Sequence, residues 1–526
     1  MHHTLPLFIT LVILIVLIIM LANKLRVAYP ILLVLGGLVV SFIPAVPKLN
    51  VDPDMIFFIF LPPLLFEAAW SISLKDLRKF WRIIGSFAFL VVFFTAMTVA
   101  LVANHFIPYI TLPLGFLLGG IVSPPDAVST GAVVRFIKIP RSTISILEGE
   151  SLLNDASSLI IFRFALLAVG TGQFIWSEAL LSFSWMVAGG VGIGLLLGWL
   201  FMQAHKRLPT DAPSDIIFTL IEPYILYYVG ELLHSSGVLS VVFGGLYLAS
   251  HRMQFLSSTS RIRGYNVWES FVYILNGLVF MIIGLELPEI VQGIRKQGIP
   301  LSTAIIYGIL ITVVLVIVRL ISSYIALGST FIFRRNTYQN MRRPGLWKLP
   351  LFMGWTGMRG VVSLAAALAI PAALPSGEAF PARELIIFIS FMVILLTLVV
   401  QGLTLPYLLK WLGVFESGYD VEVNHVLHAK NLEKELLAFS INTVNEKYSH
   451  HLDKPMIANI YHSWQEKSEF REEEMFNPEH RQVYLEILEH QRQFLLQRNR
   501  DPHMNEELIR KRLQQIDLEE EKVMFL

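Results

Sequence analysis

The chain has 526 residues, of which 55% are hydrophobic and 15% are charged, whereas a soluble domain carries about 25% charged residues. The formal net charge is +1, and no region has the density of basic residues typical of nucleic-acid binding. The absence of cysteine excludes disulfides, thiol catalysis and thiolate metal sites.

An uneven distribution of charge divides the chain into two predicted domains. Residues 417–526 carry 21 acidic and 14 basic side chains, whereas the residues before them carry 19 acidic and 27 basic side chains. We therefore predict a transmembrane domain over residues 1–412 and a cytoplasmic helical tail over residues 413–526. The tail mixes charges with apolar residues at helical spacing and is interpreted as a solvated appendage, with a regulatory or dimerisation role as the alternative.

Apolar segments predict an all-α polytopic membrane protein. The hydrocarbon core of a bilayer is about 30 Å thick, and a helix of about 20 apolar residues crosses it. We predict about 13 transmembrane helices on this basis. They cover roughly residues 5–23, 28–46, 54–70, 83–103, 112–134, 143–170, 179–202, 215–234, 237–250, 268–287, 301–328, 349–373 and 384–412.

The first segment could be a signal peptide or a membrane span. It lacks a basic leader, and no small-x-small cleavage motif follows it, so we interpret it as a span. Lysine and arginine then set the orientation: loops after odd-numbered segments contain 19 of these residues, and the other loops contain four. This asymmetry predicts that the N-terminus lies outside and the C-terminal tail lies in the cytoplasm.

Two of the predicted helices are interrupted. The fifth contains Gly-Gly-Ile-Val-Ser-Pro-Pro-Asp at residues 119–126, and the twelfth contains Gly-Trp-Thr-Gly-Met-Arg-Gly at residues 354–360. Their offset of seven segments reverses the orientation across the membrane, which indicates inverted repeats, segments 1–6 against segments 8–13. Transporters place their substrate where such broken helices meet, near the middle of the bilayer.

Ionisable residues deep in a membrane helix are functional candidates, because each costs about 2.5 kcal/mol or more on insertion scales. The deep positions are Glu67, Asp126, Glu150, Asp155, Arg163, Glu222, Glu231, Arg319 and Arg359.

Asp155 is the predicted ion-binding residue. It lies about 15–18 Å along the sixth helix, close to the midplane, with Ser151 one turn earlier and Ser158 three residues later on the same face. Carboxylate and hydroxyl oxygens suit Na⁺, by the logic that matches oxygen ligands to hard cations. The alternative is a polar cluster that is satisfied by its own backbone.

Competition at Asp155 predicts the mechanism. One buried carboxylate holds either a proton or a cation, and exchange is obligatory if the bare carboxylate does not cross the membrane. Trading one H⁺ for one Na⁺ moves no net charge, so we expect electroneutral 1:1 exchange. Additional titrating groups such as Glu67 or Asp126 could change this stoichiometry.

Among the other buried charges, two are predicted to be structural, and the roles of the rest are left open. Arg359 needs an anion, and we predict an ion pair with Glu150 that fastens the two repeats together. Arg163 either tunes the ion site or pairs elsewhere. Glu222 and Glu231 are consistent with packing or dimer contacts and are not assigned to the site.

Four sequence stretches resemble a known family. Residues 149–155, Gly-Glu-Ser-Leu-Leu-Asn-Asp, resemble the signature of the sodium/proton exchangers, in the monovalent cation:proton antiporter-1 branch that includes bacterial members. Residues 61–67, 236–240 and 357–363 match further family stretches, and the similarity runs from about residue 5 to residue 412.

The resemblance implies a fold of thirteen helices with two crossed discontinuous helices, and a homodimer. It implies that Asp155 binds the ion with Asn154 beside it, and that Ser151 and Glu67 help to form the site. It also supports the bridge between Glu150 and Arg359. In this family the Asn-Asp pair accompanies electroneutral transport.

Asp126 departs from the family pattern. Many relatives have Thr-Asp-Pro-Val-Ala-Val in the broken helix, whereas residues 123–128 are Ser-Pro-Pro-Asp-Ala-Val, which moves the acid by two positions. Asp126 either contacts the ion or caps the helix that restarts after the break.

These inferences predict a secondary active antiporter of the bacterial inner membrane that exchanges Na⁺ for H⁺. We expect no enzymatic activity, no cofactor and no nucleic-acid partner. The rival functions are a K⁺/H⁺ or Li⁺/H⁺ antiporter, a cation channel, and a membrane hydrolase. A hydrolase is disfavoured because no predicted span contains a histidine placed to act as a base.

Overall fold

The computed structural model describes residues 4–25, 27–43, 53–126, 129–131, 141–171, 176–333, 348–374, 377–412, 434–469, 478–498 and 506–525. These residues are helical apart from short connections. The chain forms two compact units, residues 1–418 and residues 419–526. The predicted domain boundary at residue 413 lies outside the described residues, as do the counted basic residues at positions 26, 48, 135, 138 and 334–343.

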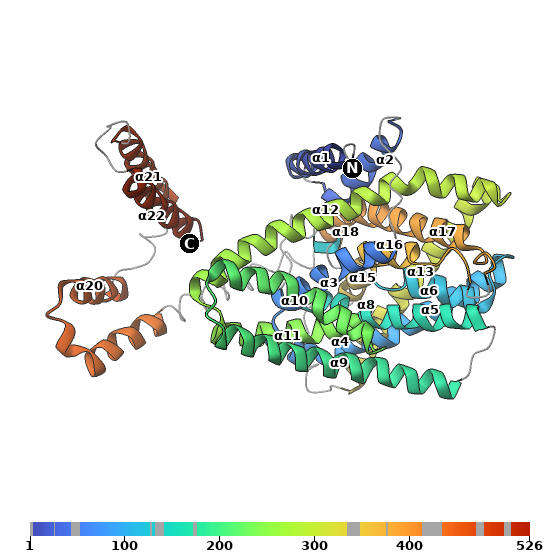
Figure 1. The fold of residues 1–526 in the computed structure, drawn as a ribbon, viewed down its shortest axis with the longest axis horizontal. Helices are drawn as coiled ribbons and strands as arrows, with labels where there is room; N and C mark the ends of the chain where they lie inside the picture. The colour runs from blue at the N-terminus through green and yellow to red at the C-terminus, as the bar shows by residue number, and fades with distance from the viewer. Residues whose placement is uncertain are drawn as a thin grey trace. The chain divides into compact units, whose positions relative to one another are not determined.

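The described residues of the first unit are mostly helical (Figure 1). Most of its helices cover predicted apolar segments, and two stretches, η1 and η2, are π-helical. The elements are α1 Thr4–Leu25, α2 Tyr29–Ser41, α3 Pro53–Ser71, α4 Leu74–Gly85, η1 Ser86–Val91, α5 Val92–Phe106, α6 Leu112–Val122, α8 Arg141–Thr171, α9 Trp176–Arg207, α10 Ala212–Leu232, α11 Gly237–Phe255, α12 Ser258–Lys296, α13 Leu301–Phe333, α15 Lys348–Trp355, α16 Val361–Leu368, α17 Arg383–Leu396, η2 Thr397–Gln401 and α18 Gly402–Leu412.

Each predicted apolar segment is helical over most of its described residues, and the fifth and twelfth segments are interrupted after Val122 and Trp355. Within the described part of the chain, six continuous helical stretches are long and apolar enough to cross a membrane, and four shorter helices are also apolar. The prediction of an all-helical, multi-pass membrane protein is confirmed. The number of thirteen spans stays a prediction.

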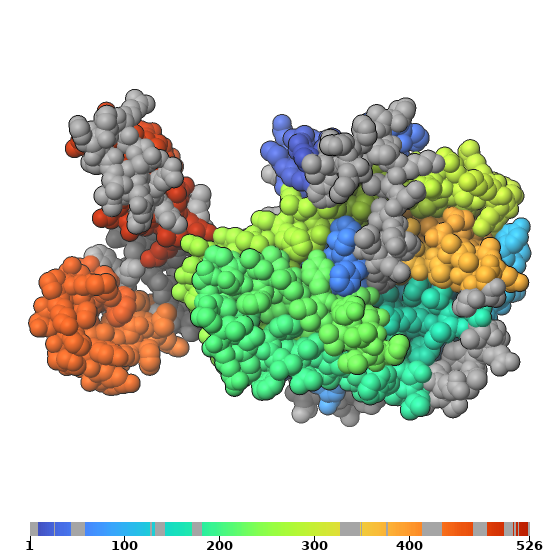
Figure 2. Space-filling model, viewed as in Figure 1, coloured from blue at the N-terminus to red at the C-terminus, as the bar shows by residue number. Residues whose placement is uncertain are grey.

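The outer surface of the first unit is apolar, as contact with lipid requires. Helix α9, in green, lies on the face drawn in Figure 2. Its Leu196 is 57% exposed and its Trp199 is 45% exposed, with Leu195 and Leu200 exposed nearby. Such a continuous exposed apolar surface is unusual in a soluble protein but normal where lipid is the solvent.

Glycines bring helices into backbone contact. A Cβ atom at Gly284 of α12 would lie 2.1 Å from the carbonyl oxygen of Val34 on α2, and one at Gly37 of α2 would lie 2.2 Å from the carbonyl oxygen of Met281. Small residues permit this approach, which drives helix association where water is absent. Helix α12, which runs along the first unit in Figure 1, is thereby locked to α2.

Two more glycines fix α6 between its neighbours. A Cβ atom at Gly119 would lie 2.5 Å from the carbonyl oxygen of Ala96 on α5, and one at Gly120 would lie 2.9 Å from the backbone nitrogen of Phe162 on α8. The end of α6, where the chain leaves the helix at Ser123, is therefore held against α8.

The second unit, described by itself, contains α20 Pro455–Glu469, α21 Pro478–Arg498 and α22 Glu506–Phe525. Helices α21 and α22 pair through buried Leu488, Ile509 and Ile516. Arg492 joins them at the surface, with ion pairs to Asp517 (2.9 Å) and Glu520 (2.5 Å). Arg492 also lowers the pKa of Glu489 by hydrogen bonding to its carboxylate.

The α2–α12 contact predicts a selective stability effect. Gly284→Ala adds a methyl group that collides with backbone, so we expect it to lower the free energy of unfolding by about 1–3 kcal/mol. Gly192→Ala is the matched control, because nothing lies within 4 Å of the added atom, and it changes stability by less than about 1 kcal/mol. Thermal unfolding in detergent measures both variants. Equal midpoints would contradict the inferred contact.

Candidate functional site

The two interrupted helical segments meet at their breaks. Helix α6 ends at Val122, and in the second segment α15 ends at Trp355 and α16 begins at Val361. The Asp126 N–H donates to the carbonyl oxygen of Met358 (2.7 Å), and the Thr130 hydroxyl donates to that of Thr356 (2.9 Å). Each break thus satisfies polar backbone of the other, as non-helical chain in an apolar environment requires.

Arg359 completes this junction. Its side chain is fully buried, and Nε donates to the carbonyl oxygen of Val122 (2.8 Å) while Nη2 donates to that of Ser123 (3.4 Å). Nη1 donates to the carbonyl oxygen of Gly357. The cation therefore caps the carboxyl end of α6, where unpaired carbonyls and the helix dipole favour positive charge.

The predicted ion pair between Glu150 and Arg359 is corrected by the structure. Glu150 on α8 pairs with Arg319 on α13 through two parallel hydrogen bonds, of which Nη2–Oε2 measures 2.9 Å. Both side chains are buried, at 1% and 2% exposure. The donors of Arg359 are used by backbone carbonyls, whereas Arg319 presents its guanidinium edge to the carboxylate, the favourable bidentate geometry.

Asp155 and Asn154 lie on α8 beside the first break. Asp155 is 8% exposed and Asn154 is fully buried. Asn154 Nδ2 donates to the carbonyl oxygen of Pro125 (3.2 Å), so the amide reaches into the break. In the described residues, Asn154 Oδ1 and Ser123 Oγ are buried without a hydrogen-bond partner. The Ser158 hydroxyl instead donates to the backbone carbonyl of Asp155 (2.9 Å).

Asp126 has a capping geometry. Its Oδ2 accepts hydrogen bonds from the Ser129 hydroxyl (2.6 Å) and the Ser129 N–H (3.3 Å), as at the start of a helix. A Cβ atom at Gly360 would lie 1.8 Å from the same oxygen, so glycine is required there. The carboxylate also interacts electrostatically with Asp155. Asp126 is therefore near the predicted ion site while its carboxylate is engaged by Ser129.

Glu67 and Ser151 lie toward the amino-terminal half of α8. Glu67, on α3 directly after the Pro62-Pro63 region, is half-buried and interacts electrostatically with Glu148. Glu148 and Ser151 precede Asp155 by two turns and one turn on one face of α8. The structure places Ser151 along this face and Glu67 close enough to interact with Glu148. The roles of Glu67 and Ser151 as ion ligands stay predictions.

The two π-helical stretches, η1 and η2, each accept a hydrogen bond from a residue of the site region. The Ser157 hydroxyl of α8 donates to the carbonyl oxygen of Ala88 in η1. The Arg359 N–H donates to the Thr397 hydroxyl in η2 (3.2 Å). π-Helical turns free backbone carbonyls for such contacts and are frequent at functional sites.

Comparison with known proteins identifies the family. Residues 10–411 match the profile described as sodium/hydrogen exchanger, transmembrane. The chain belongs to this family. It is a family of transporters and not of enzymes, which confirms the expected absence of an enzymatic role.

Individual relatives agree with this membership. The chain is 32% identical over 417 residues to the sodium, potassium, lithium and rubidium/H⁺ antiporter of Bacillus pumilus, covering 78% of this chain and 61% of that relative. It is 32% identical over 422 residues to the Na⁺/H⁺ antiporter ApNhaP of Aphanothece halophytica, covering 80% of this chain and 76% of that relative. Bacterial relatives and apolar helices together support a multi-pass protein of the plasma membrane.

A solved structure shares the fold. The sodium proton antiporter MjNhaP1 from Methanocaldococcus jannaschii superimposes with a TM-score of 0.61 at 20% sequence identity, covering 78% of this chain and 98% of that one. At this level of identity the likeness extends to the fold alone.

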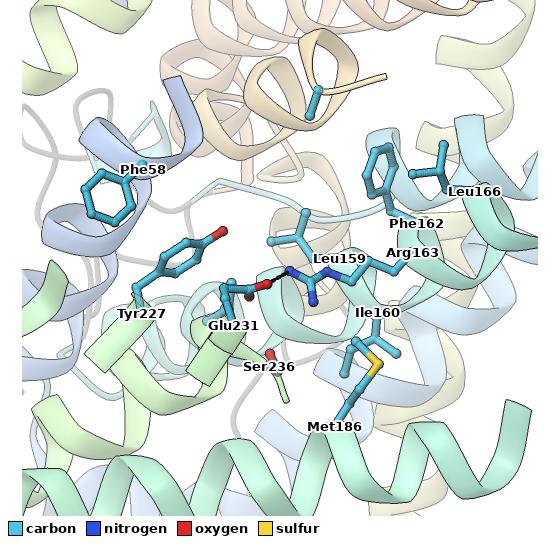
Figure 3. Close-up of a pocket in the computed structure, with 12 residues that line it drawn as sticks. Phe58, Leu159, Ile160, Phe162, Arg163, Leu166, Met186, Tyr227, Glu231 and Ser236 are labelled. Atoms are coloured by element: carbon cyan, nitrogen blue, oxygen red, sulfur yellow. Dashed lines mark hydrogen bonds and ion pairs between the residues drawn. The ribbon is translucent and has the colours of Figure 1, made fainter. Parts of the chain in front are cut away.

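In this exchanger-family chain, Arg163 pairs with Glu231. The distance from Nη2 to Glu231 Oε2 is 2.5 Å, and the other oxygen of Glu231 accepts from the Gly237 N–H (3.0 Å). The pair borders a cavity of about 420 Å³ (Figure 3). Of the two roles considered for Arg163, the structure thus shows pairing elsewhere.

A second polar cluster escaped the sequence reasoning. His205 Nδ1 lies 2.9 Å from Asp215 Oδ1, and His205 Nε2 lies 2.9 Å from Glu222 Oε1, with all three side chains buried. The Ser260 hydroxyl donates to Asp215 Oδ2 (2.7 Å). His205 and Asp215 lie on either side of the α9–α10 loop, so their position in the sequence indicates exposure to solvent. The available signal was the spacing of Asp215 and Glu222, two turns apart on one helix.

The Glu150–Arg319 pair predicts strong energetic coupling between two buried positions on different helices. Glu150→Gln or Arg319→Gln alone strands a buried charge, so we expect each to lower the free energy of unfolding by about 3–5 kcal/mol. The loss in free energy of unfolding for the double variant is smaller than the sum of the two single losses by about 0.5–3 kcal/mol. Thermal unfolding in detergent measures the cycle.

The control is the partly exposed pair of Arg383 and Glu384 (2.8 Å). Glu384→Gln lowers stability by less than about 1 kcal/mol. Additive losses at Glu150 and Arg319 would contradict the pairing.

Proposed function

We propose that this chain is a secondary active antiporter that exchanges a monovalent cation, with Na⁺ preferred, for H⁺ at Asp155. The observation that carries the proposal is the position of Asp155. It is a buried carboxylate next to the meeting point of two broken helices, in a chain of the exchanger family. The chain spans 61% of the Bacillus pumilus relative, so its activity is proposed from its own residues.

The neighbouring charges favour Asp155 as the exchanging group. Glu150 is neutralised by Arg319, and the charge of Arg359 faces backbone carbonyls. Asp126 is held by the hydroxyl and N–H of Ser129. Asp155 has no such cationic partner in the described residues, so its negative charge is balanced only when it binds a proton or a cation.

Oxygen atoms around Asp155 suit a monovalent cation. The Asp155 carboxylate and Asn154 Oδ1 are the two proposed central ligands, because the amide oxygen is buried and its amide nitrogen is fixed by Pro125. Ser151 and Glu67 add oxygen ligands from the amino-terminal side, and Asp126 contributes through its charge. Buried oxygen ligands replace the hydration shell that a small hard cation loses.

Alternating access at one carboxylate explains exchange. The bare carboxylate is poorly solvated in the membrane interior and does not cross, whereas the protonated form and the cation-bound form do. One proton is exchanged for one cation, so the cycle is electroneutral with 1:1 stoichiometry. In the cell such exchange contributes to pH homeostasis.

The proposed architecture follows the sequence predictions. We propose thirteen membrane spans in inverted repeats, with the α6 and α15–α16 segments crossing at their breaks. The hydrogen bonds that Asp126 and Thr130 donate to the carbonyl oxygens of Met358 and Thr356 support the crossing. The N-terminus is proposed to lie outside and residues 413–526 in the cytoplasm, and the family resemblance supports a homodimer.

A K⁺/H⁺ or Li⁺/H⁺ antiporter is the second candidate. The Bacillus pumilus relative is named for sodium, potassium, lithium and rubidium. The proposed ligands are a carboxylate and an amide oxygen, and neither chemical group excludes the larger cations.

The proposal predicts that Asp155→Asn abolishes cation/proton exchange. Everted vesicles with an imposed pH gradient and a pH-sensitive dye report proton movement when Na⁺, K⁺ or Li⁺ is added. We expect cation-dependent dequenching for the unmodified protein, and none above empty vesicles for Asp155→Asn, because an amide cannot exchange a proton for a cation. Asp453→Asn, at an exposed acid of the second unit, is the matched control and retains exchange.

Clamping the membrane potential in the same assay tests the stoichiometry. Electroneutral exchange keeps its rate when the potential is clamped. Exchange that persists in Asp155→Asn would contradict the site, and a rate that follows the potential would contradict the 1:1 ratio. A lack of response to all three cations would contradict antiport itself.

A further inference from the structure

One ion pair joins the helix that carries Asp155 to a neighbouring helix across a cavity. Arg163 extends from α8 to Glu231 on α10 (2.5 Å), and Figure 3 shows the two side chains meeting beside Tyr227 and Ser236. The cavity of about 420 Å³ is lined by residues of α3, α8, α9, α10 and α11, and by Ala369 at the end of α16. The pair therefore bridges separate walls of this space.

The face of α8 that carries Asp155 also leads to the cavity. Glu148, Ser151, Asp155, Leu159 and Arg163 follow each other at spacings of three or four residues and share one face. Glu148 is exposed and Ser151 is half-buried, whereas Asp155 and Leu159 are buried at 8% and 6% exposure. The approach to Asp155 is therefore lined by polar groups on the Glu148 side and is interrupted on the Arg163 side.

Leu159 is the residue at which the interruption occurs. Leu159, Ile160, Phe162 and Arg163 line the cavity, whereas Asp155, one turn before Leu159, does not. A rise of 1.5 Å per residue separates Asp155 from Arg163 by about 12 Å along the axis. A path from Asp155 to the far side of the cavity therefore passes first Leu159 and then the ion pair of Arg163 and Glu231.

The α10 side of the ion pair is firmly held. Glu231 Oε1 accepts from the Gly237 N–H (3.0 Å) at the tight α10–α11 junction. A Cβ atom at Gly237 would lie 2.7 Å from the carbonyl oxygen of Tyr227, so the two helices are in close contact there. Movement of α8 relative to α10 must therefore break the bond between Arg163 and Glu231 rather than carry Glu231 along.

We propose that Arg163 and Glu231 form a gate that closes the route between Asp155 and the outer solution. The structure holds this gate closed, and transport requires that it opens once in each cycle. The outward direction follows from the predicted topology, in which α8 ends and α10 meets α11 outside the cytoplasm. The inference rests on the proposed antiport function, and both residues act on access rather than as ion ligands.

A reversible cross-link tests the gate. The chain has no cysteine, so Arg163→Cys/Glu231→Cys introduces the only two thiols. A bifunctional thiosulfonate reagent long enough to span the replaced side chains bridges them, and a reducing agent releases the bridge. We expect bridging to reduce Na⁺/H⁺ exchange to the level of empty vesicles and reduction to restore it. Single-cysteine variants treated identically retain exchange.

The outcomes separate the gate from the antiport function. Absence of exchange in the unmodified protein would overturn the proposed function, on which the gate rests. Exchange in the unmodified protein together with undiminished exchange in the bridged variant would overturn the gate alone.

A second measurement does not depend on transport by the variants. Leu159→Cys is labelled in intact cells by a membrane-impermeant maleimide, with and without Glu231→Gln. We expect loss of the ion pair to speed labelling of Leu159→Cys about two- to fivefold, since a partly exposed ion pair contributes modestly to the closed state. Glu289→Gln, at an exposed acid of α12, is the matched control and leaves the rate unchanged. An unchanged rate in Glu231→Gln, or faster labelling only in everted vesicles, would overturn the outer gate.

Discussion

Reciprocal hydrogen bonding between two broken helices is the constraint on which the rest of the site depends. Non-helical backbone surrounded by apolar side chains is stable only when its polar groups find partners. Here Asp126 bonds to Met358, and Arg359 bonds to the last carbonyls of α6. Because each break provides partners for the other, neither can be straightened or displaced alone. This junction fixes the backbone against which Asn154 and Asp155 are presented.

The pairing of the buried charges then determines which buried carboxylate is able to exchange a proton for a cation. The buried pair of Glu150 and Arg319 is neutral and links α8 to α13. Arg359 is also buried, but its partners are carbonyl oxygens, so its charge strengthens the junction. Among the residues that the structure describes, Asp155 therefore has no direct cationic partner. A carboxylate without a fixed cation is what a site needs if a proton and a metal cation are to replace one another. The same reasoning explains why a mobile cation, rather than an arginine, is the proposed partner of Asp155.

Much of the fold was predictable from local sequence. Apolar length predicted the helices, and the Gly and Pro residues at 119–126 and 354–360 predicted both breaks, because these residues act on the backbone where they stand. Partners across the fold were not predictable in this way. Whether Glu150 meets Arg319 or Arg359 depends on the rotation and depth of α13, which no single segment encodes. The cluster around His205 was missed for a related reason: His205 and Asp215 flank a loop, and they are buried by the packing of α9 and α10 with neighbouring helices such as α12.

Proton release on cation binding tests the central claim most directly. Purified protein in weakly buffered detergent solution receives NaCl, with choline chloride as the control, while a dye reports the pH and calorimetry reports Na⁺ binding. Competition at Asp155 predicts the release of about one proton for each Na⁺ bound at a pH where the carboxyl group is protonated, and no release from Asp155→Asn. Binding of Na⁺ without proton release, or equal release from Asp155→Asn, would contradict the account.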